Sequence, residues 1–425
     1  MIKKLTSNLT FWVLLAGVFG YVAAIAVGDS SWVSSEQPPA IYQLVLLVKS
    51  SFLALLKMLI APIIFFSLIG GLLNIGDARR LKSLGGITVS YYLATTAIAI
   101  GIGLAVVLFF HPWVGTVEQI TVTSLVNDPN YVQPKSFIDK TGGSLLSVLS
   151  NLLSIAFTNP FTALAELNIL GIATNAFMFG LAMVLVVPAD SPLVKGVHHI
   201  NDMLHKVLSW VILTTPFGVF AILFDVTLKS GGTLISSLLG FFAVVVGATL
   251  VHGLVVLPLI AKLFANTGPA ELFRKGGKPL MVAFATSSSS ATLPVSIATA
   301  EEEFGVSQTV SGFVLPLGAT MNMDGTALFE GIAAVFLAYL FGIDLTTIGM
   351  ITVFLMAMVS SIGAPGMPSG SMAGMQMVLL GAGIPLEAIG ILLVVERPLD
   401  TIRTAVNVQG DLVGSLVVQK FFAKA

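Results

Sequence analysis

The sequence contains no cysteine and little charge. Its 425 residues include 20 Lys and Arg, 21 Asp and Glu, and five His. Without cysteine there is no disulfide framework and no thiolate to act as nucleophile or metal ligand. A formal net charge of -1 gives no basic field for nucleic acid, and the scattered histidines form no H-E-x-x-H motif. We therefore expect no nucleic-acid partner, no organic cofactor and no transition-metal site.

The sequence is rich in long apolar runs. Apolar residues make up 56% of the chain, and runs of about 20 residues, enough to cross a hydrocarbon core of about 30 Å, recur along it. The pattern predicts an all-α polytopic membrane protein, with its first six spans near 9–28, 42–75, 86–110, 143–187 (broken), 207–228 and 233–263. Lys3 and Lys4 before the first run also fit a signal peptide cleaved near Ala24 and Ala26, but the run is long enough to span.

Positive charge predicts the orientation of these spans. With the N-terminus in the cytoplasm, GDARRLKSLG at 76–85 and RKGGK at 274–278 lie inside, where Lys and Arg are favoured. Lys135, Lys140 and Lys229 are the basic residues left outside. We expect a multi-pass protein of the cell (inner or plasma) membrane with both termini cytoplasmic. Four basic residues fall at membrane depth: Lys49, Lys57, Arg397 and Arg403.

Two segments after residue 264 carry Ser, Gly and Pro where a spanning helix should be apolar. They are VAFATSSSSATLPVSIATAEEEF at 282–304 and SSIGAPGMPSGSMAG at 360–374. Non-helical backbone is tolerated at membrane depth only inside protein or beside a wet cavity, so we expect two re-entrant helical hairpins in addition to eight spans. Each hairpin is followed by a span that we expect to be broken, at 318–331 and at 396–411. One hairpin opens from the cytoplasm and the other from outside, so the units form inverted repeats, which are typical of transporters with a midplane substrate site.

The last span carries a polar stripe. At 100° per residue, five polar residues lie within about 100° of one another: Asp400, Arg403, Thr404, Asn407 and Asp411. Structural ion pairs between helices are the alternative interpretation of any one of them. A charged side chain at mid-bilayer costs about 2.5–3.5 kcal/mol on insertion scales, so a whole stripe favours a binding site. Carboxylate, amide and hydroxyl oxygens beside NMDGT at 322–326 suit a hard cation such as Na⁺.

Three motifs carry a resemblance to a known family. TSSSSATLP at 286–294, NMDGTALFE at 322–330 and DTIRTAVNVQGD at 400–411 resemble the signature segments of the glutamate/aspartate transporters, the dicarboxylate/amino acid:cation symporters. That family includes the excitatory amino acid transporters and their prokaryotic homologues. The resemblance implies a homotrimer with an elevator mechanism, in which a scaffold (1–82 and 113–229) holds a mobile transport domain (83–112 and 230–425).

The resemblance also implies a substrate site for an acidic amino acid, L-glutamate or L-aspartate. Arg403 would pair with the side-chain carboxylate, Asp400 with the α-ammonium, and Asn407 with hairpin hydroxyls and N–H groups would hold the α-carboxylate. The serine run is then the tip of the first hairpin, with a flexible turn as the alternative. The implied substrate-binding residues are Ser287, Ser288, Ser289, Thr326, Met367, Pro368, Ser369, Gly370, Ser371, Asp400, Arg403, Thr404 and Asn407.

Sodium sites follow from the same resemblance, which implies more than one bound Na⁺. The first set is Asn322, Asn407, Asp411 and the carbonyl of Gly318; the second is Thr320, Met323, Ser361, Ile362 and Ala364; the third is Tyr92, Thr95, Thr96, Asn322 and Asp324. YYLATT on the third span supplies the tyrosine and the threonine pair. Tyr92 by itself would more often be an ordinary buried tyrosine.

Charged positions depart from the family pattern in two places. Archaeal members carry Arg at the position of Ser287 and vertebrate members carry it at that of Thr401, whereas this chain has neither. Arg397 is our candidate for the second positive charge. Glu330 stands where archaeal members have Gln and vertebrate acidic amino acid transporters have Glu, so it is a candidate for proton or K⁺ coupling, with a structural glutamate as the alternative.

The second hairpin departs as well. Its tip is bulkier than the glycine-rich form of the family, because it contains Met367, Pro368 and Ser369. The space for a substrate at this tip therefore differs from that in the family pattern.

Three other functions are weighed against acidic amino acid transport. A C4-dicarboxylate carrier would not need the ammonium partner that Asp400 offers, and a neutral amino acid carrier would not need Arg403. An intramembrane enzyme could use Asp324 and Asp411 as an aspartyl pair, but the chain has no G-x-G-D, G-x-S-x-G or H-E-x-x-H motif. We therefore expect a transporter and not an enzyme.

Overall fold

The structure is a computed structural model that describes residues 9–33, 35, 37–73, 84–114, 150, 153–230, 234–363, 366 and 370–422. Within these ranges every regular element is a helix, in agreement with the predicted all-α chain. Four of the predicted site residues lie outside the described ranges: Ala364, Met367, Pro368 and Ser369.

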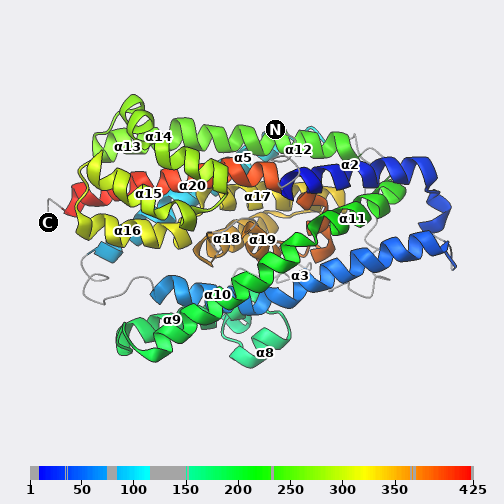
Figure 1. The fold of residues 1–425 in the computed structure, drawn as a ribbon, viewed down its shortest axis with the longest axis horizontal. Coiled ribbons are helices and arrows are strands. Elements are labelled where there is room, and N and C mark those ends of the chain that lie inside the picture. The colour runs from blue at the N-terminus through cyan, green and yellow to red at the C-terminus, as the bar shows by residue number, and fades with distance from the viewer. Residues whose placement is uncertain are drawn as a thin grey trace.

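A first helical group runs along the lower part of Figure 1 and up its right-hand side. It comprises α2 (Leu9–Val27), η1 (Ser30–Val33), α3 (Ala40–Leu73), α8 (Pro160–Ala165), α9 (Ile169–Val186), α10 (Pro192–Leu213) and α11 (Thr215–Ser230). The long helix α3 packs against α9, α10 and α11, and α2 packs along α11. Buried Asp225 of α11 accepts hydrogen bonds from Tyr42 (2.6 Å) and Lys49 (2.9 Å) of α3. This pairing explains how Lys49 is accommodated at membrane depth.

A second helical group holds the motifs identified from sequence. It comprises α5 (Gly86–Phe109), α12 (Leu234–Val251), the π-helical η3 (His252–Val256), α13 (Leu257–Ala265), α14 (Pro269–Thr286), α15 (Ser289–Glu302), α16 (Gln308–Met321), α17 (Asp324–Leu340), α18 (Thr347–Gly363), α19 (Ser371–Gly381), η4 (Leu386–Ala388) and α20 (Ile389–Phe422). The last helix, α20, contacts α14, α15, α16 and α17, and α5 packs along α17. The second group is therefore organised around α20 and α17.

Several helices are able to cross a membrane. In the described part of the chain, four stretches are long and apolar enough: Ala40–Leu73, Gly86–Phe109, Ser236–Ala265 and Gln308–Leu340. A fifth is obtained if α10 and α11, which meet at 51°, count as one bent span. The span predicted at 207–228 lies within this bent pair, which starts at Pro192. Pro216 lacks the N–H that would continue α10, and the bend follows at Thr214.

The two segments rich in Ser, Gly and Pro form pairs of packed helices. We call α14 with α15 the first hairpin and α18 with α19 the second hairpin. The first hairpin reverses at Ser287, whose φ of +50° is a left-handed conformation that terminates α14. The join between the two helices of each pair lies inside the predicted segment, although α14 and α18 begin 13 residues before the segments at 282–304 and 360–374.

One of the two predicted helix breaks is present. The helix α16 ends at Met321 and α17 begins at Asp324, so the chain is not helical at Asn322 and Met323. The predicted break at 396–411 is wrong, because α20 runs without interruption from Ile389 to Phe422 although Pro398 lies inside it. Polar side chains of α20 form hydrogen bonds with residues of neighbouring helices. The backbone of α20 therefore does not have to unwind to supply hydrogen-bonding groups.

Candidate functional site

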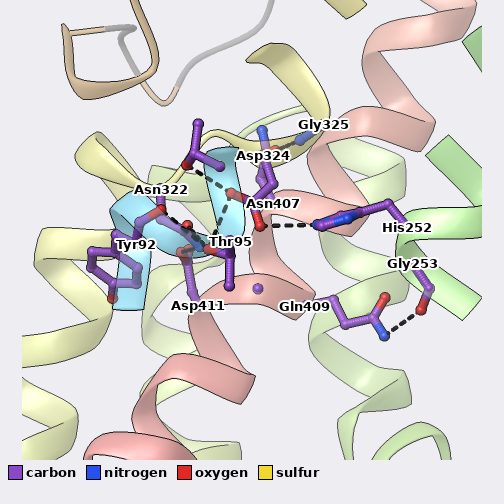
Figure 2. A network of polar contacts seen from close by, with 12 residues as sticks. Tyr92, Thr95, His252, Gly253, Asn322, Asp324, Gly325, Asn407, Gln409 and Asp411 are labelled. Atoms are coloured by element: carbon purple, nitrogen blue, oxygen red, sulfur yellow. Dashed lines mark hydrogen bonds and ion pairs between the residues drawn. The ribbon is translucent and has the colours of Figure 1, made fainter. Parts of the chain in front are cut away.

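Asp324 is the centre of a buried polar cluster shown in Figure 2. It is the first residue of α17, where the positive end of the helix dipole favours a carboxylate. Its Oδ1 accepts hydrogen bonds from Thr96 at 2.8 Å and from Thr95 at 3.3 Å, both on α5. Asp324 is fully buried. Two threonines of the third predicted sodium set thus contact one carboxylate, whereas the Tyr92 hydroxyl of that set donates to the carbonyl oxygen of Val314 at 2.7 Å.

Asp411 and Asn322 extend this cluster. Asn322 Nδ2 donates to Asp411 Oδ1 at 3.0 Å, and Asn322 Oδ1 accepts from Thr95 at 3.3 Å. Gly318 of α16 is essential to the packing, because a Cβ there would overlap the Asp411 carboxylate and lie 2.6 Å from the Tyr92 hydroxyl. The first and third predicted sodium sets therefore share Asn322 and form one continuous oxygen-rich region.

Asn407 connects the cluster to the substrate stripe of α20. Its Oδ1 accepts the backbone N–H of Gly325 at 2.7 Å, and its Nδ2 lies 3.3 Å from Met323 Sδ and 3.3 Å from Thr326 Oγ1. Gly325 lets α17 and α20 approach closely, since a Cβ there would lie 2.7 Å from the carbonyl oxygen of Arg403. The break in the seventh span is therefore fixed directly against α20.

His252 is a member of the cluster that the sequence analysis missed. Its Nε2 lies 3.0 Å from Asp324 Oδ2, and both side chains are fully buried. Next to it, Gln409 Nε2 donates to the carbonyl oxygen of Gly253 at 2.7 Å, inside the π-helical turn (Figure 2). A histidine within the apolar run at 233–263 was a signal in itself, because ionisable residues at membrane depth are usually functional.

Arg403 is the centre of a second buried cluster. Its Nη2 donates to Ser371 Oγ (3.1 Å), Glu396 Oε1 (3.1 Å) and Asp400 Oδ1 (3.2 Å). The face of its guanidinium lies 3.9 Å from the ring centre of Phe329, a cation–π contact. Arg403 is 0% exposed, and its Nε and Nη1 have no hydrogen-bond partner among the described residues.

The serine run lies at the tip of the first hairpin. Ser288 Oγ accepts the N–H of Ala291 at 3.1 Å, which caps α15, and donates to the carbonyl oxygen of Gly366 at 2.7 Å. Ser287 and Ser289 beside it are buried, as is Thr404 on α20. The tips of the two hairpins therefore touch, and the described part of the second hairpin tip is Gly366 and Gly370.

Glu330 and Arg397, the two candidates for added charge, lie in different surroundings. Glu330 Oε1 accepts a hydrogen bond of 2.8 Å from Ser360 of α18, and the carboxylate lies so close to Gly374 of α19 that a Cβ there would be 2.5 Å from it. Arg397 lines a narrow cavity between the two helical groups, together with Gln376 and residues of α3 and α10. Glu330 therefore faces both arms of the second hairpin, whereas Arg397 faces the first helical group. The coupling role of Glu330 and the substrate role of Arg397 remain predictions.

The second predicted sodium set is not joined by hydrogen bonds among the described residues. Thr320 Oγ1 donates to the carbonyl of Leu317 at 3.1 Å and Ser361 Oγ to that of Met358 at 2.8 Å, each within its own helix. The helices that carry them, α16 and α18, do pack together, and Ile362 is half-buried. This set also remains a prediction.

The donor atoms of the first cluster fit a hard cation. Carboxylate, amide and hydroxyl oxygens converge there from α5, α16, α17 and α20, and such oxygens are what Na⁺-like ions prefer. In the ranges that the structure describes, no three His, Asp or Glu side chains form a metal-binding group. The donor atoms that do converge in the cluster are thus the oxygens that a hard cation prefers.

Comparison with known proteins places the chain in a family. A model described as "Sodium:dicarboxylate symporter family" matches residues 9–421. The chain belongs to this family. The "Neutral amino acid transporter B(0)" of Oryctolagus cuniculus is 33% identical over 390 residues, which cover 87% of this chain and 72% of that protein. An "Excitatory amino acid transporter" of Caenorhabditis elegans is 30% identical over 399 residues, which cover 86% of this chain and 79% of that protein.

Membership in the sodium:dicarboxylate symporter family agrees with the resemblance seen in the sequence motifs. The family and these relatives are transporters, and sodium coupling is a property of the family. Together with the long apolar helices, membership makes the chain a multi-pass membrane transporter. The names of the relatives refer both to neutral and to excitatory amino acids, so they leave the substrate of this symporter to be argued from its site.

Proposed function

We propose that this chain is a secondary active transporter that couples Na⁺ entry to the uptake of an acidic amino acid, L-glutamate or L-aspartate. The observation that carries the proposal is the burial of Arg403 with part of its guanidinium left without hydrogen-bond partners. This guanidinium is fully buried, and two of its nitrogens have no partner among the described residues. Buried donors without acceptors are costly, and a substrate carboxylate would satisfy them with charge-assisted hydrogen bonds.

The neighbours of Arg403 supply the remaining contacts of an amino acid. Asp400 is 3.2 Å from the guanidinium and offers a carboxylate to the α-ammonium. Thr326 and Asn407, which contact each other at 3.3 Å, offer a hydroxyl and an amide to the α-carboxylate. A C4-dicarboxylate would place a second anion against Asp400, which disfavours that class.

Sodium is proposed to bind at the Asp324 and Asp411 cluster. The Asn407 side chain contacts the break between α16 and α17 and also Thr326, so it links the cation cluster to the substrate stripe. An ion that orders this break would order the substrate site as well. Each positive charge that moves inward through about 100 mV contributes roughly 2.3 kcal/mol to accumulation.

The elevator mechanism is proposed from the division into two helical groups. Both hairpins, the broken span and α20 belong to the second group, as does every residue of the two buried clusters. The first group supplies no hydrogen bond to either cluster among the described residues. A moving second group could thus carry substrate and ions together against a fixed first group. The family resemblance supports the homotrimer.

Coupling of a further ion is proposed at Glu330. Its carboxylate contacts α18 and approaches α19, so a change from neutral to ionised would act on both arms of the second hairpin. The proton is the coupled ion we favour, and K⁺ exchange is the alternative. A structural glutamate without coupling is the competing interpretation.

The proposed location is the cell (inner or plasma) membrane, with both termini in the cytoplasm. The distribution of Lys and Arg supports this orientation.

A neutral amino acid carrier is the second candidate function. It is favoured by the name of the rabbit relative and by the pairing of Arg403 with two carboxylates of the chain itself. In that case Arg403 would be a structural cation.

Uptake into proteoliposomes under an inward Na⁺ gradient separates these functions. Labelled aspartate, glutamate, succinate and serine are offered in turn to the wild type and to Arg403→Cys, with Arg274→Cys on the exposed face of α14 as the matched control. We expect uptake of aspartate or glutamate by the wild type, its loss in Arg403→Cys and a gain of serine uptake there. Aspartate affinity that is the same in Arg403→Cys would sink the assignment. Serine uptake without aspartate uptake by the wild type would favour the neutral carrier.

A further inference from the structure

Glu396 holds Arg403 from within the same helix. It lies two turns before Arg403 on α20, and its side chain is 1% exposed. Its Oε1 accepts from Arg403 Nη2 at 3.1 Å and from Ser371 Oγ at 3.3 Å. The spacing of Glu396, Asp400 and Arg403 places all three on one face of the helix. Glu396 is therefore a carboxylate of the protein that already binds Nη2 of Arg403, beside Nε and Nη1, which are left for a substrate carboxylate.

The guanidinium is crowded on one nitrogen. Nη2 carries two hydrogens but has three acceptors within 3.2 Å, from Ser371, Glu396 and Asp400. Two of these acceptors are carboxylates, so the charge of Arg403 is shared before any ligand binds. The Phe329 ring covers the face of the guanidinium at 3.9 Å and limits its rotation. A substrate carboxylate must therefore bind a cation that is already partly neutralised.

We propose that Glu396 is a specificity-determining residue, a resident carboxylate that competes with the side chain of an acidic substrate for Arg403. The inference rests on the proposed function, because it takes Arg403 as the carboxylate site. Glu396 repels an incoming anionic side chain and lowers the affinity for aspartate, whereas serine, which has no side-chain charge, is not penalised. Glu396 thus shifts the balance that Arg403 sets between acidic and neutral amino acids toward the neutral ones.

Glu396 also links this competition to the second hairpin. Its Oε1 contacts Ser371, the first residue of α19, and Ser371 also accepts from Arg403. A substrate carboxylate that binds Nε and Nη1 and draws the guanidinium toward itself would weaken the contact of Nη2 with Ser371 of α19. Selection of the substrate and release of this arm of the hairpin would then occur in one step.

The test is Glu396→Gln, which keeps the size of the side chain and removes its charge. Binding of aspartate and of serine is measured with the purified full-length chain in NaCl by isothermal titration and by ligand-dependent thermal shift. We expect the Kd for aspartate to fall about tenfold, as removal of a nearby like charge predicts, while binding of serine does not tighten. Glu396→Asp, which keeps the charge but withdraws it by one methylene, should tighten aspartate binding by a smaller factor.

Glu271→Gln is the matched control. Glu271 is paired with Lys275 at 2.7 Å on the surface of α14, and the hydrogen bond from Lys275 lowers the pKa of Glu271, so this substitution removes an ionised carboxylate far from the site. It should change neither affinity.

Three outcomes would overturn the inference. If Glu396→Gln weakens the binding of aspartate and the binding of serine in the same proportion, Glu396 is a positioning residue only. Glu396→Asp is read in the same way if Glu396→Gln does not fold. If aspartate binding is unchanged in both variants, Glu396 does not compete. If the wild type binds aspartate in Na⁺, either result leaves the proposed function intact; if the wild type does not bind aspartate at all, the proposed function fails too.

Discussion

Ser288 of the first hairpin donates a hydrogen bond of 2.7 Å to the carbonyl oxygen of Gly366 in the second hairpin, 78 residues away. The backbone N–H of Ser290 donates to the same oxygen at 3.0 Å. Gly366 has no room for a side chain, since a Cβ would overlap the carbonyl of Ala319 and lie 2.6 Å from Ser290 Oγ. One carbonyl group thus joins the tips of both hairpins.

Ser288→Ala should loosen this junction. The variant loses the cap of α15 and the bond to Gly366, a change that costs about 0.5–2 kcal/mol for a helix cap alone. We expect bound aspartate to leave the purified transporter faster, as measured by stopped-flow dissociation. Ser290→Ala is the control, because Ser290 contacts Gly366 through its backbone. Equal release rates in the wild type and both variants would show that the junction does not limit dissociation.

Gly318→Ala should weaken the response to sodium. The added Cβ overlaps the Asp411 carboxylate and lies 2.6 Å from the Tyr92 hydroxyl, so one of these must move. We expect a higher Na⁺ concentration for half-maximal aspartate binding. Gly312→Ala on the same helix has no atom within 4 Å of its Cβ and should leave this concentration unchanged. A normal Na⁺ response in Gly318→Ala would remove Asp411 from the cation site.

His252→Ala should act on the same cluster from the other side. Loss of the ring leaves Asp324 Oδ2 without its donor, at a cost on the order of 1–3 kcal/mol for a buried polar group. We expect lower thermal stability and a raised Na⁺ requirement, with His252→Gln, which keeps an N–H donor, less affected. His199→Ala, an exposed position on α10, is the control. A loss of stability with an unaltered Na⁺ requirement would make His252 structural only.

Glu330→Gln should separate exchange from net uptake. The variant keeps an acceptor for Ser360 but cannot gain or lose a proton. Exchange of internal for external aspartate should continue, while the acceleration of net uptake by an inward proton gradient, or by internal K⁺, should disappear. Net uptake by the wild type that ignores both gradients would reduce Glu330 to a structural residue.

The positions of the site residues could be predicted because the bilayer makes polar groups conspicuous. Four serines at 287–290, the NMDGT segment and the charges of the last span stand out in an apolar chain. The serines lie at a hairpin tip, and Asn322, Asp324, Asp400, Arg403 and Asp411 are buried, whereas Arg397 lines a cavity. Helix breaks were harder to predict. A stripe of polar residues has the same sequence pattern in a helix that unwinds and in an intact helix whose polar side chains bond to neighbouring helices. The helix α20 is of the second kind.

The partner of Asp324 on the sixth predicted span was not predicted from the sequence. His252 meets Asp324 across 72 residues, and this pairing depends on how the π-helical turn after α12 lies against α17 and α20. The bond between Glu396 and Arg403 is different, since both residues lie on one helix at a spacing of seven. Helical periodicity places them on one face, but it does not say that they contact each other rather than a ligand.

Uptake of labelled aspartate by the wild-type protein in proteoliposomes tests the central claim most directly. An inward Na⁺ gradient is compared with an inward choline gradient of the same size, at equal pH on both sides. The proposed function predicts that aspartate accumulates above its external concentration only with Na⁺, and that a negative internal potential increases this accumulation. Aspartate uptake that proceeds equally well in choline would contradict the account.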